Sequence, residues 1–127
     1  MPEIGTTILL AEDDLTLGEM YAERLHQEGF SVVHAKDGQE ALDLIETTRP
    51  AAIILDIMMP KMNGLDVLKT FKDNPEYTDI PVIIVTALVQ EIERVKELLG
   101  PKDMYLIKSE VMPGDIIEKI KSIVEAE

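Results

Sequence analysis

Acidic and other polar residues directly follow four apolar runs of this sequence. The first run leads into Glu12, Asp13 and Asp14, the next into Asp56, and the last two into Thr86 and Lys108. A carboxylate such as Asp56, placed directly after Ile53–Leu55, can end a strand, cap a helix, bind a metal or act as a nucleophile. The choice among these roles depends on whether the fold brings the ends of the runs together.

The chemistry of these side chains is coherent if they do meet. Carboxylates about 4 Å apart repel each other by several kcal/mol at an intermediate dielectric, and each raises the pKa of the other unless a cation joins them. A hard cation with oxygen ligands suits such a cluster, and Mg²⁺ suits a site with few protein ligands, several waters and a phosphate. Lys108 would add a positive charge for a phosphoryl oxygen, and Thr86 a hydroxyl donor. The residues therefore predict a Mg²⁺ site that handles a phosphoryl group.

The overall charge argues against binding to nucleic acid. The chain has 25 acidic and 12 basic residues, a formal charge of −13, whereas nucleic-acid binding depends on Lys and Arg that neutralise phosphates. Nucleotide binding is also disfavoured, because such sites place glycines or hydroxyl residues after the first strand, where backbone N–H groups cradle phosphate. Here that segment is the acidic "AEDD".

Apolar clusters and amphipathic segments alternate five times along the chain. The patterns predict strands at 7–12, 31–35, 51–56, 81–86 and 104–107, and helices at 15–28, at 38–48, from about 64, at 89–99 and from 113. Asp14 stands where a helix cap is expected, Asp37 and Gly38 where the second helix should open, and Gly29 where the first helix should end. The strand at 31–35 is short and polar, which is typical of a sheet edge.

Five strand–helix pairs with unbroken apolar strands predict a parallel sheet covered by helices on both faces. Ligands of such sheets bind beyond the carboxyl ends of the strands, where the strand order reverses.

The 127 residues fit one domain. No apolar run approaches the roughly 20 residues that cross a bilayer, and no export signal is visible. The lack of cysteine excludes disulfides and fits a cytoplasmic protein.

At these positions the chain resembles the CheY-like receiver domains of two-component response regulators, the phosphoacceptor partners of histidine kinases. The resemblance rests on Glu12–Asp13, on Asp56 within "LDIMMPKMNG", on Thr86–Ala87 and on Lys108 after "MYLI". It covers essentially the whole chain. It implies a three-layer, doubly wound (βα)5 fold of the flavodoxin type, with five parallel strands in the order 2-1-3-4-5.

The resemblance also implies roles for single residues. Asp56 would accept a phosphoryl group from the phosphohistidine of a histidine kinase or phosphotransfer protein and lose it by slow self-catalysed hydrolysis. Mg²⁺ would be bound by Asp13, Asp56 and the backbone carbonyl of Met58, with Glu12 assisting through water. Lys108 would neutralise the phosphoryl group and Thr86 would close onto it. Tyr105 would move with Thr86 and change the surface of the fourth helix, fifth strand and fifth helix.

The resemblance leaves the output open. With residues 1–127 read as a single receiver domain, the signal would pass to a partner protein or to an output domain outside this chain, without direct contact with nucleic acid or a membrane. A phosphorylation-dependent homodimer is an alternative for which the sequence has no signature.

The sequence departs from the family pattern at two positions. Ser109 follows Lys108 where family members usually have a proline, so we expect a trans peptide bond, because a cis bond before a non-proline residue costs about 2.5–4 kcal/mol. Met58, two residues after Asp56, has a side chain that cannot orient an attacking water by hydrogen bonding. Self-dephosphorylation should therefore be slow.

Each of these residues has a plainer interpretation when taken alone. Asp56 and Asp14 could be helix caps, which we favour for Asp14; Lys108 could be solvated, Thr86 an ordinary strand residue and Tyr105 an edge-strand aromatic. Met58, Met59 and Met62 are expected to pack in the turn, and His26 and His34 to be structural or surface residues.

Two rival functions are a pseudo-receiver that only binds partners and a phosphatase with an aspartyl-phosphate intermediate. The dehalogenase-type phosphatase would have a second Asp where Met58 stands.

Overall fold

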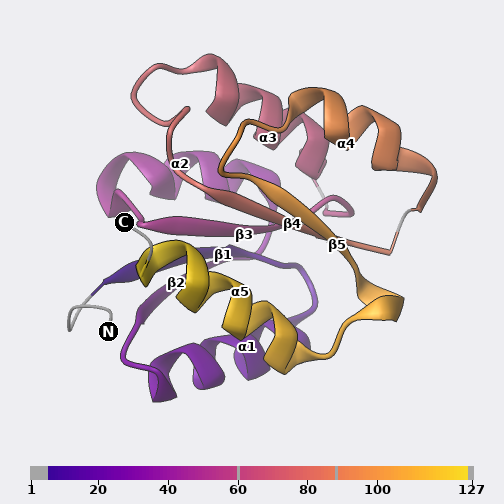
Figure 1. Ribbon diagram of the computed structural model, residues 1–127. Coiled ribbons are helices and arrows are strands. Elements are labelled where there is room, and N and C mark those ends of the chain that lie inside the picture. Colours follow the sequence, from indigo (N-terminus) through magenta and orange to yellow (C-terminus); the bar gives the residue numbers. More distant parts are fainter. Residues whose placement is uncertain (1–5, 60, 88, 126–127) are drawn as a thin grey trace.

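Five parallel strands form a single sheet in the computed structural model, which describes residues 6–59, 61–87 and 89–125 (Figure 1). The strands are β1 (Thr7–Ala11), β2 (Ser31–Ala35), β3 (Ala52–Asp56), β4 (Val82–Thr86) and β5 (Met104–Ile107). Their order is β2-β1-β3-β4-β5, as predicted. The polar strand β2 lies at an edge, and the apolar strands β1, β3 and β4 lie inside the sheet.

The strand order reverses between β1 and β3, and the register there determines which residues meet. Ala11 pairs with Leu55, so the residues that follow them, Glu12 and Asp56, leave this part of the sheet side by side. On the other side of β3, Asp56 pairs with Val85. The carboxyl ends of the three central strands therefore end at one edge of the sheet, at the switch point where ligands bind in this class of fold.

Helices cover both faces of the sheet (Figure 1). They are α1 (Leu15–Gln27), α2 (Gly38–Thr48), α3 (Gly64–Asp73), α4 (Ile92–Leu98) and α5 (Pro113–Glu125), with short 3₁₀ turns at Val89–Glu91 and Lys108–Glu110. α1 and α5 lie on one face, and α2, α3 and α4 on the other. Each face has its own apolar core, because alternate residues of every strand point to opposite sides.

Side-chain caps begin three of the helices. Asp14 accepts a hydrogen bond from the Leu17 N–H, as predicted, and Asp37 accepts one from the Glu40 N–H at the start of α2. Asn63 caps α3 in the same way, at the end of the loop that follows β3. Such caps stabilise a helix by about 1 kcal/mol each.

The fourth helix is shorter than the pattern predicted. The expected stripe ran from Val89 to Leu99, but α4 covers only Ile92–Leu98 and is preceded by the 3₁₀ turn. Ile92 and Val95 are buried as expected. Leu99 is already extended (φ −73°, ψ 136°), because the chain must turn there toward β5. The pattern identified the buried face of the helix but not its ends.

A buried ion pair ties together the amino-terminal ends of β4 and β5. Lys72 of α3 lies 2.8 Å from the Asp103 carboxylate and also donates to the carbonyls of Thr78 and Ile80. Asp103 in turn accepts from the Val82 N–H at the start of β4. The pair lies at the edge opposite the acidic residues, so it anchors the far ends of the strands that carry Thr86 and Lys108.

No helix among the described residues is long and apolar enough to cross a bilayer.

Candidate functional site

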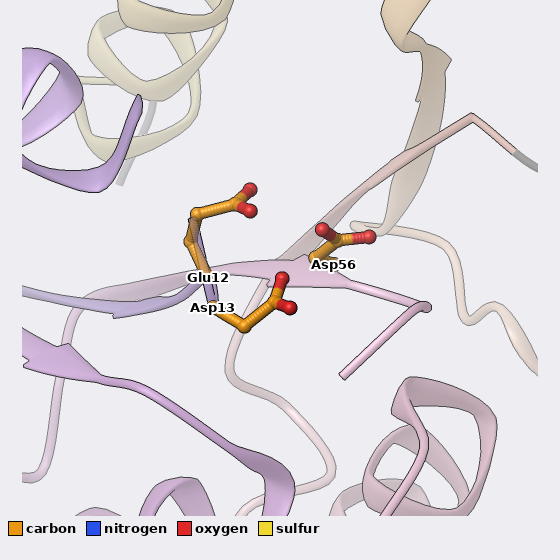
Figure 2. Close-up of side chains that lie close together, drawn as sticks. All are labelled: Glu12, Asp13 and Asp56. Atoms are coloured by element: carbon orange, nitrogen blue, oxygen red, sulfur yellow. The ribbon is translucent and has the colours of Figure 1, made fainter. Parts of the chain in front are cut away.

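Three carboxylates from two strand ends meet at the switch point of the sheet. Each of Glu12, Asp13 and Asp56 offers an oxygen that lies within 4.8 Å of the others. Figure 2 shows the three side chains turned toward a common space. Glu12 and Asp56 are buried, at 2% and 3% exposure, whereas Asp13 is exposed. The sequence prediction that these residues would meet is therefore confirmed.

The loop after β3 contacts the Asp56 carboxylate through a backbone N–H group. The Met58 N–H donates to Asp56 Oδ1 at 3.1 Å. Close approach of the chain at Gly64 makes this loop compact: a Cβ there would lie 2.3 Å from the Asp56 carbonyl oxygen and 2.5 Å from the Ile57 Cα. Only a glycine fits at the start of α3, and the loop can then return tightly to the end of the strand.

Lys108 supplies the positive charge of the site. Its Nζ donates to Asp56 Oδ2 at 2.9 Å and lies 3.3 Å from Glu12 Oε2. It follows directly on β5, at the start of the 3₁₀ turn. No peptide bond among the described residues is cis, so the Lys108–Ser109 bond is trans, as expected. The lysine, which follows β5, thus contacts both buried carboxylates, which follow β1 and β3.

Burial and repulsion shift the protonation of these groups. Burial, together with the charge of Asp56, raises the pKa of Glu12 to about 7, although Lys108 acts in the opposite direction. Burial alone would lower the pKa of Lys108, but its hydrogen bond to Asp56 and the charges of Asp56 and Glu12 outweigh that effect and raise it. Burial and the charge of Glu12 also raise the pKa of Tyr21, on α1. The site thus contains more negative charge than Lys108 alone compensates.

A hard divalent cation fits this arrangement. The converging ligand atoms are all carboxylate oxygens, the donors that Mg²⁺ and Ca²⁺ prefer. Two of the carboxylates are buried, and burial together with the charge of Asp56 raises the pKa of Glu12. A cation next to them would remove that repulsion. The residues that could hold it are Glu12, Asp13 and Asp56.

The remaining predicted residues lie around this cluster or farther away. Thr86 is fully buried at the end of β4 and pairs with Ile107, the residue before Lys108. Tyr105 is outside the cluster: it is half-buried on β5, and its ring has the Lys96 ammonium 5.8 Å from its centroid. Asp14 caps α1, and its N–H donates to Glu12 Oε1 at 3.2 Å. Asp14 therefore contributes to the turn of the acidic segment mainly through its backbone.

One methionine differs from its prediction. Met59 is buried and Met62 packs against the apolar core, as expected of residues in the turn. Met58, in contrast, is 54% exposed, because its neighbour Met59 takes the inward position. Its side chain lines the open groove above Asp56.

Sequence reasoning missed two groups of residues. The groove has a volume of about 670 Å³ and is also lined by Glu91 and Arg94 near α4, whose charges lie 3.6 Å apart. No motif marks these two residues, since their place depends on how α4 packs.

His34 was treated as an ordinary structural or surface residue, but its Nε2 lies 2.7 Å from the Glu12 carbonyl oxygen. Its position opposite the acidic segment follows only from the pairing of β1 with β2.

Residues 8–121 match the family of response regulator receiver domains, and the chain belongs to that family. It is therefore a receiver domain of two-component signalling, with the doubly wound fold that the resemblance implied. Among similar proteins, the response regulator MprA of Mycolicibacterium vanbaalenii is 41% identical over 101 residues, which are 80% of this chain and 43% of that protein. The transcriptional regulatory protein CpxR of Escherichia coli K12 is 39% identical over 116 residues, 91% of this chain and 48% of that protein.

This chain thus spans less than half the length of these two relatives. Among solved structures, the signal receiver domain of a signal transduction histidine kinase from Syntrophus aciditrophicus superimposes with a TM-score of 0.86 at 27% identity, covering 96% of this chain and 92% of that one. The phosphorylated cyanobacterial phytochrome response regulator RcpA gives a TM-score of 0.79 at 26% identity, covering 95% and 92%.

The raised pKa of Glu12 predicts a specific pH dependence of stability. Because Glu12 binds its proton more tightly in the folded protein (pKa about 7) than at its ordinary value of 4.5, its contribution to stability falls as the pH rises through this range. Glu12→Gln has no such proton. Without metal, the free energy of unfolding of the variant relative to wild type should rise by about 1–3 kcal/mol between about pH 4.5 and pH 7.5.

Urea denaturation in the presence of a chelator measures this difference. Glu46→Gln, on the exposed face of α2, is the matched control and should differ from wild type by the same amount at every pH. A pH-independent difference for Glu12→Gln would show that the surroundings of Glu12 do not raise its pKa.

Proposed function

We propose that this receiver domain is a phosphorylation-activated switch that accepts a phosphoryl group on Asp56. The observation that carries the proposal is the set of contacts around this one carboxylate. Lys108 lies 2.9 Å from Oδ2, the Met58 N–H donates to Oδ1, and Glu12 and Asp13 stand within reach of a shared cation. Glu12 has neighbours of the same kinds, but Lys108 lies closer to Asp56, at 2.9 Å against 3.3 Å from Glu12.

The reaction moves one phosphoryl group between two nucleophiles. An Asp56 oxygen attacks the phosphorus of a phosphohistidine on a histidine kinase or phosphotransfer protein; the new O–P bond forms as the N–P bond breaks, and the electron pair of that bond returns to the imidazole. Such transfers need positioning and electrostatic stabilisation of the equatorial oxygens more than covalent catalysis. The opening of the groove above Asp56 leaves a path for the donor.

Each neighbouring side chain has a role in this scheme. Asp13, Asp56 and the Met58 carbonyl would hold Mg²⁺, with Glu12 assisting through water, and the ion would neutralise charge on the phosphoryl oxygens. The Lys108 ammonium, which now contacts Asp56, would move its hydrogen bond to a phosphoryl oxygen. Thr86, at the end of the next strand, would donate its hydroxyl to another.

Phosphorylation would then act through β4 and β5. It adds about −1.5 to −2 charges at this edge, which is enough to bias a two-state element if Thr86 bonds the new oxygens. Thr86 alternates onto the same face of the sheet as Ile84, and Ile84 pairs with Tyr105 on β5. This neighbourhood supports Tyr105 as the residue that carries the change to the surface of α4, β5 and α5.

The partners follow from this scheme as proposals. A histidine kinase or phosphotransfer protein would supply the phosphoryl group. Residues 1–127 would serve as one receiver domain, and the output would be a separate protein or a further domain, as the length of the two relatives suggests. The acidic charge of −13 supports a protein partner rather than direct contact with DNA, and a homodimer formed on phosphorylation is a second form of output.

Labelling with a small phosphodonor tests the central proposal. Incubation with acetyl phosphate or phosphoramidate and Mg²⁺ should add one phosphoryl group, detected by intact mass, and Asp56→Asn should abolish it because the nucleophilic oxygen is lost. Omission of Mg²⁺ should do the same.

Asp43→Asn, on the exposed face of α2, is the control and should label like wild type. Absence of labelling in wild type would favour a pseudo-receiver that only binds partners. Rapid continuous turnover of the donor, without a stable label, would instead favour a phosphatase.

Met58 predicts a long-lived phosphoprotein. Its exposed side chain beside Asp56 has no polar atom suited to orient an attacking water. Met58→Asn supplies an amide there and should shorten the lifetime of the phosphoryl group about tenfold, a change of about 1.4 kcal/mol in the barrier. Decay of the label is followed by mass spectrometry after removal of the donor.

Met112→Asn is the matched control, since Met112 is the other strongly exposed methionine among the described residues (71%). A wild-type lifetime of seconds, or equal lifetimes for wild type and Met58→Asn, would contradict this role.

The switch is tested by amide NMR spectra recorded before and after phosphorylation. Signals of α4, β5 and α5 should shift. In Thr86→Val, which keeps the shape but lacks the hydroxyl, those shifts should shrink while the label on Asp56 persists. Unchanged spectra of these elements in the phosphorylated wild type would refute transmission through Thr86 and Tyr105.

A further inference from the structure

A histidine from the edge strand reaches the acidic segment of the site. His34 lies near the end of β2, where it pairs with Leu10, and is half-buried. Its Nε2 is 2.7 Å from the backbone carbonyl oxygen of Glu12. A carbonyl oxygen can only accept a hydrogen bond, so Nε2 must bear the proton and donate it. This contact spans two strands and joins residues 22 positions apart.

The helix that covers this region is adapted to the imidazole ring. A Cβ at Gly18, in α1, would lie 2.3 Å from His34 Cε1 and 2.7 Å from Nε2. No side chain other than hydrogen fits there while the ring occupies its place. Gly18 and His34 are thus a matched pair, in which the glycine lets the ring pack against the helix backbone and reach the end of β1.

The bond acts on a peptide that matters to the site. The Glu12 carbonyl belongs to the peptide unit that joins Glu12 to Asp13, the two carboxylates on this side of the cluster. The Glu12 N–H donates to the Ala35 carbonyl at 3.0 Å, so both backbone groups of Glu12 are held by the end of β2. The orientation of this peptide determines where the two side chains point.

We propose that His34 is a positioning residue for the metal site: it holds the Glu12–Asp13 peptide through its Nε2–H and so preorganises both carboxylates for a divalent cation. The inference rests on the proposed function, because it concerns the same cation site. His34 does not touch the cation or the phosphoryl group; it acts on Glu12 and Asp13 by limiting the conformations of the segment that carries them. Preorganisation of this kind increases affinity because less freedom is lost on binding.

Two substitutions separate the hydrogen bond from the packing of the ring. His34→Phe keeps an aromatic ring against Gly18 but has no donor, whereas His34→Gln loses the ring but keeps an N–H donor at the same number of bonds from Cβ as Nε2 of histidine. Mg²⁺ binding, measured by isothermal titration calorimetry without any phosphodonor, should weaken about threefold to tenfold in His34→Phe, the range expected for the loss of one hydrogen bond. His34→Gln should recover most of the affinity. His26→Phe, the same change at the exposed histidine of α1, should bind like wild type.

A measurement on the wild-type protein covers the case in which His34→Phe does not fold. In ¹⁵N–¹H NMR spectra, the His34 imidazole should be the Nε2–H form with a proton protected from solvent exchange, and its signal should shift when Mg²⁺ is added. The His26 signal should not shift.

The outcomes distinguish the two proposals. Equal Mg²⁺ affinity of wild type and His34→Phe, failure of His34→Gln to restore affinity, or an unprotected His34 proton would overturn the positioning role and leave the proposed function intact. A wild-type protein that binds no Mg²⁺ would overturn the cation site of the proposed function, and the role of His34 with it.

Discussion

Repulsion between two buried carboxylates is the constraint around which this edge of the protein is organised. Glu12 and Asp56 leave adjacent strands side by side, and their burial makes water a poor screen. Lys108 lies between them and compensates part of the charge, yet the pKa of Glu12 remains near 7. The negative charge that Lys108 leaves uncompensated is the charge that the proposed cation would balance. A buried carboxylate pair placed for stability alone would be a poor solution, because apolar residues of the same volume would serve better.

The scaffold tolerates this strain because the rest of it is apolar and well anchored. The central strands β1, β3 and β4 are almost completely buried and fix the direction of their ends. The Lys72–Asp103 pair holds the opposite ends of β4 and β5, and close packing at Gly64 brings the loop after β3 back against Asp56. A new charge at Asp56 would act first on Lys108, which contacts this carboxylate at 2.9 Å.

Much of the fold and of the site could be predicted from local patterns. Apolar runs, the cap at Asp14 and the Asp37–Gly38 opening located the strands and helix starts closely, because these signals depend on neighbours in the chain. The ends of α4 were misplaced, since the 3₁₀ turn and the early exit at Leu99 depend on the route to β5. Met58 was expected to pack in the turn but is exposed, whereas Met59 is buried and Met62 packs against the core, and only the tertiary packing distinguishes the three.

By itself, the sequence determined the order of elements and the residue types at the strand ends: carboxylates, a lysine and a hydroxyl, the set from which a cation and a phosphoryl group were inferred. These are local properties, set by period and by side-chain chemistry. The tertiary structure alone decided the contacts between distant residues. Lys108 bonds to Asp56 at 2.9 Å, and His34 bonds to the Glu12 carbonyl; each bond joins residues from different strands. The raised pKa of Glu12 also depends on a residue of another strand, Asp56. Their energies depend on distance and burial, which exist only once the sheet has formed.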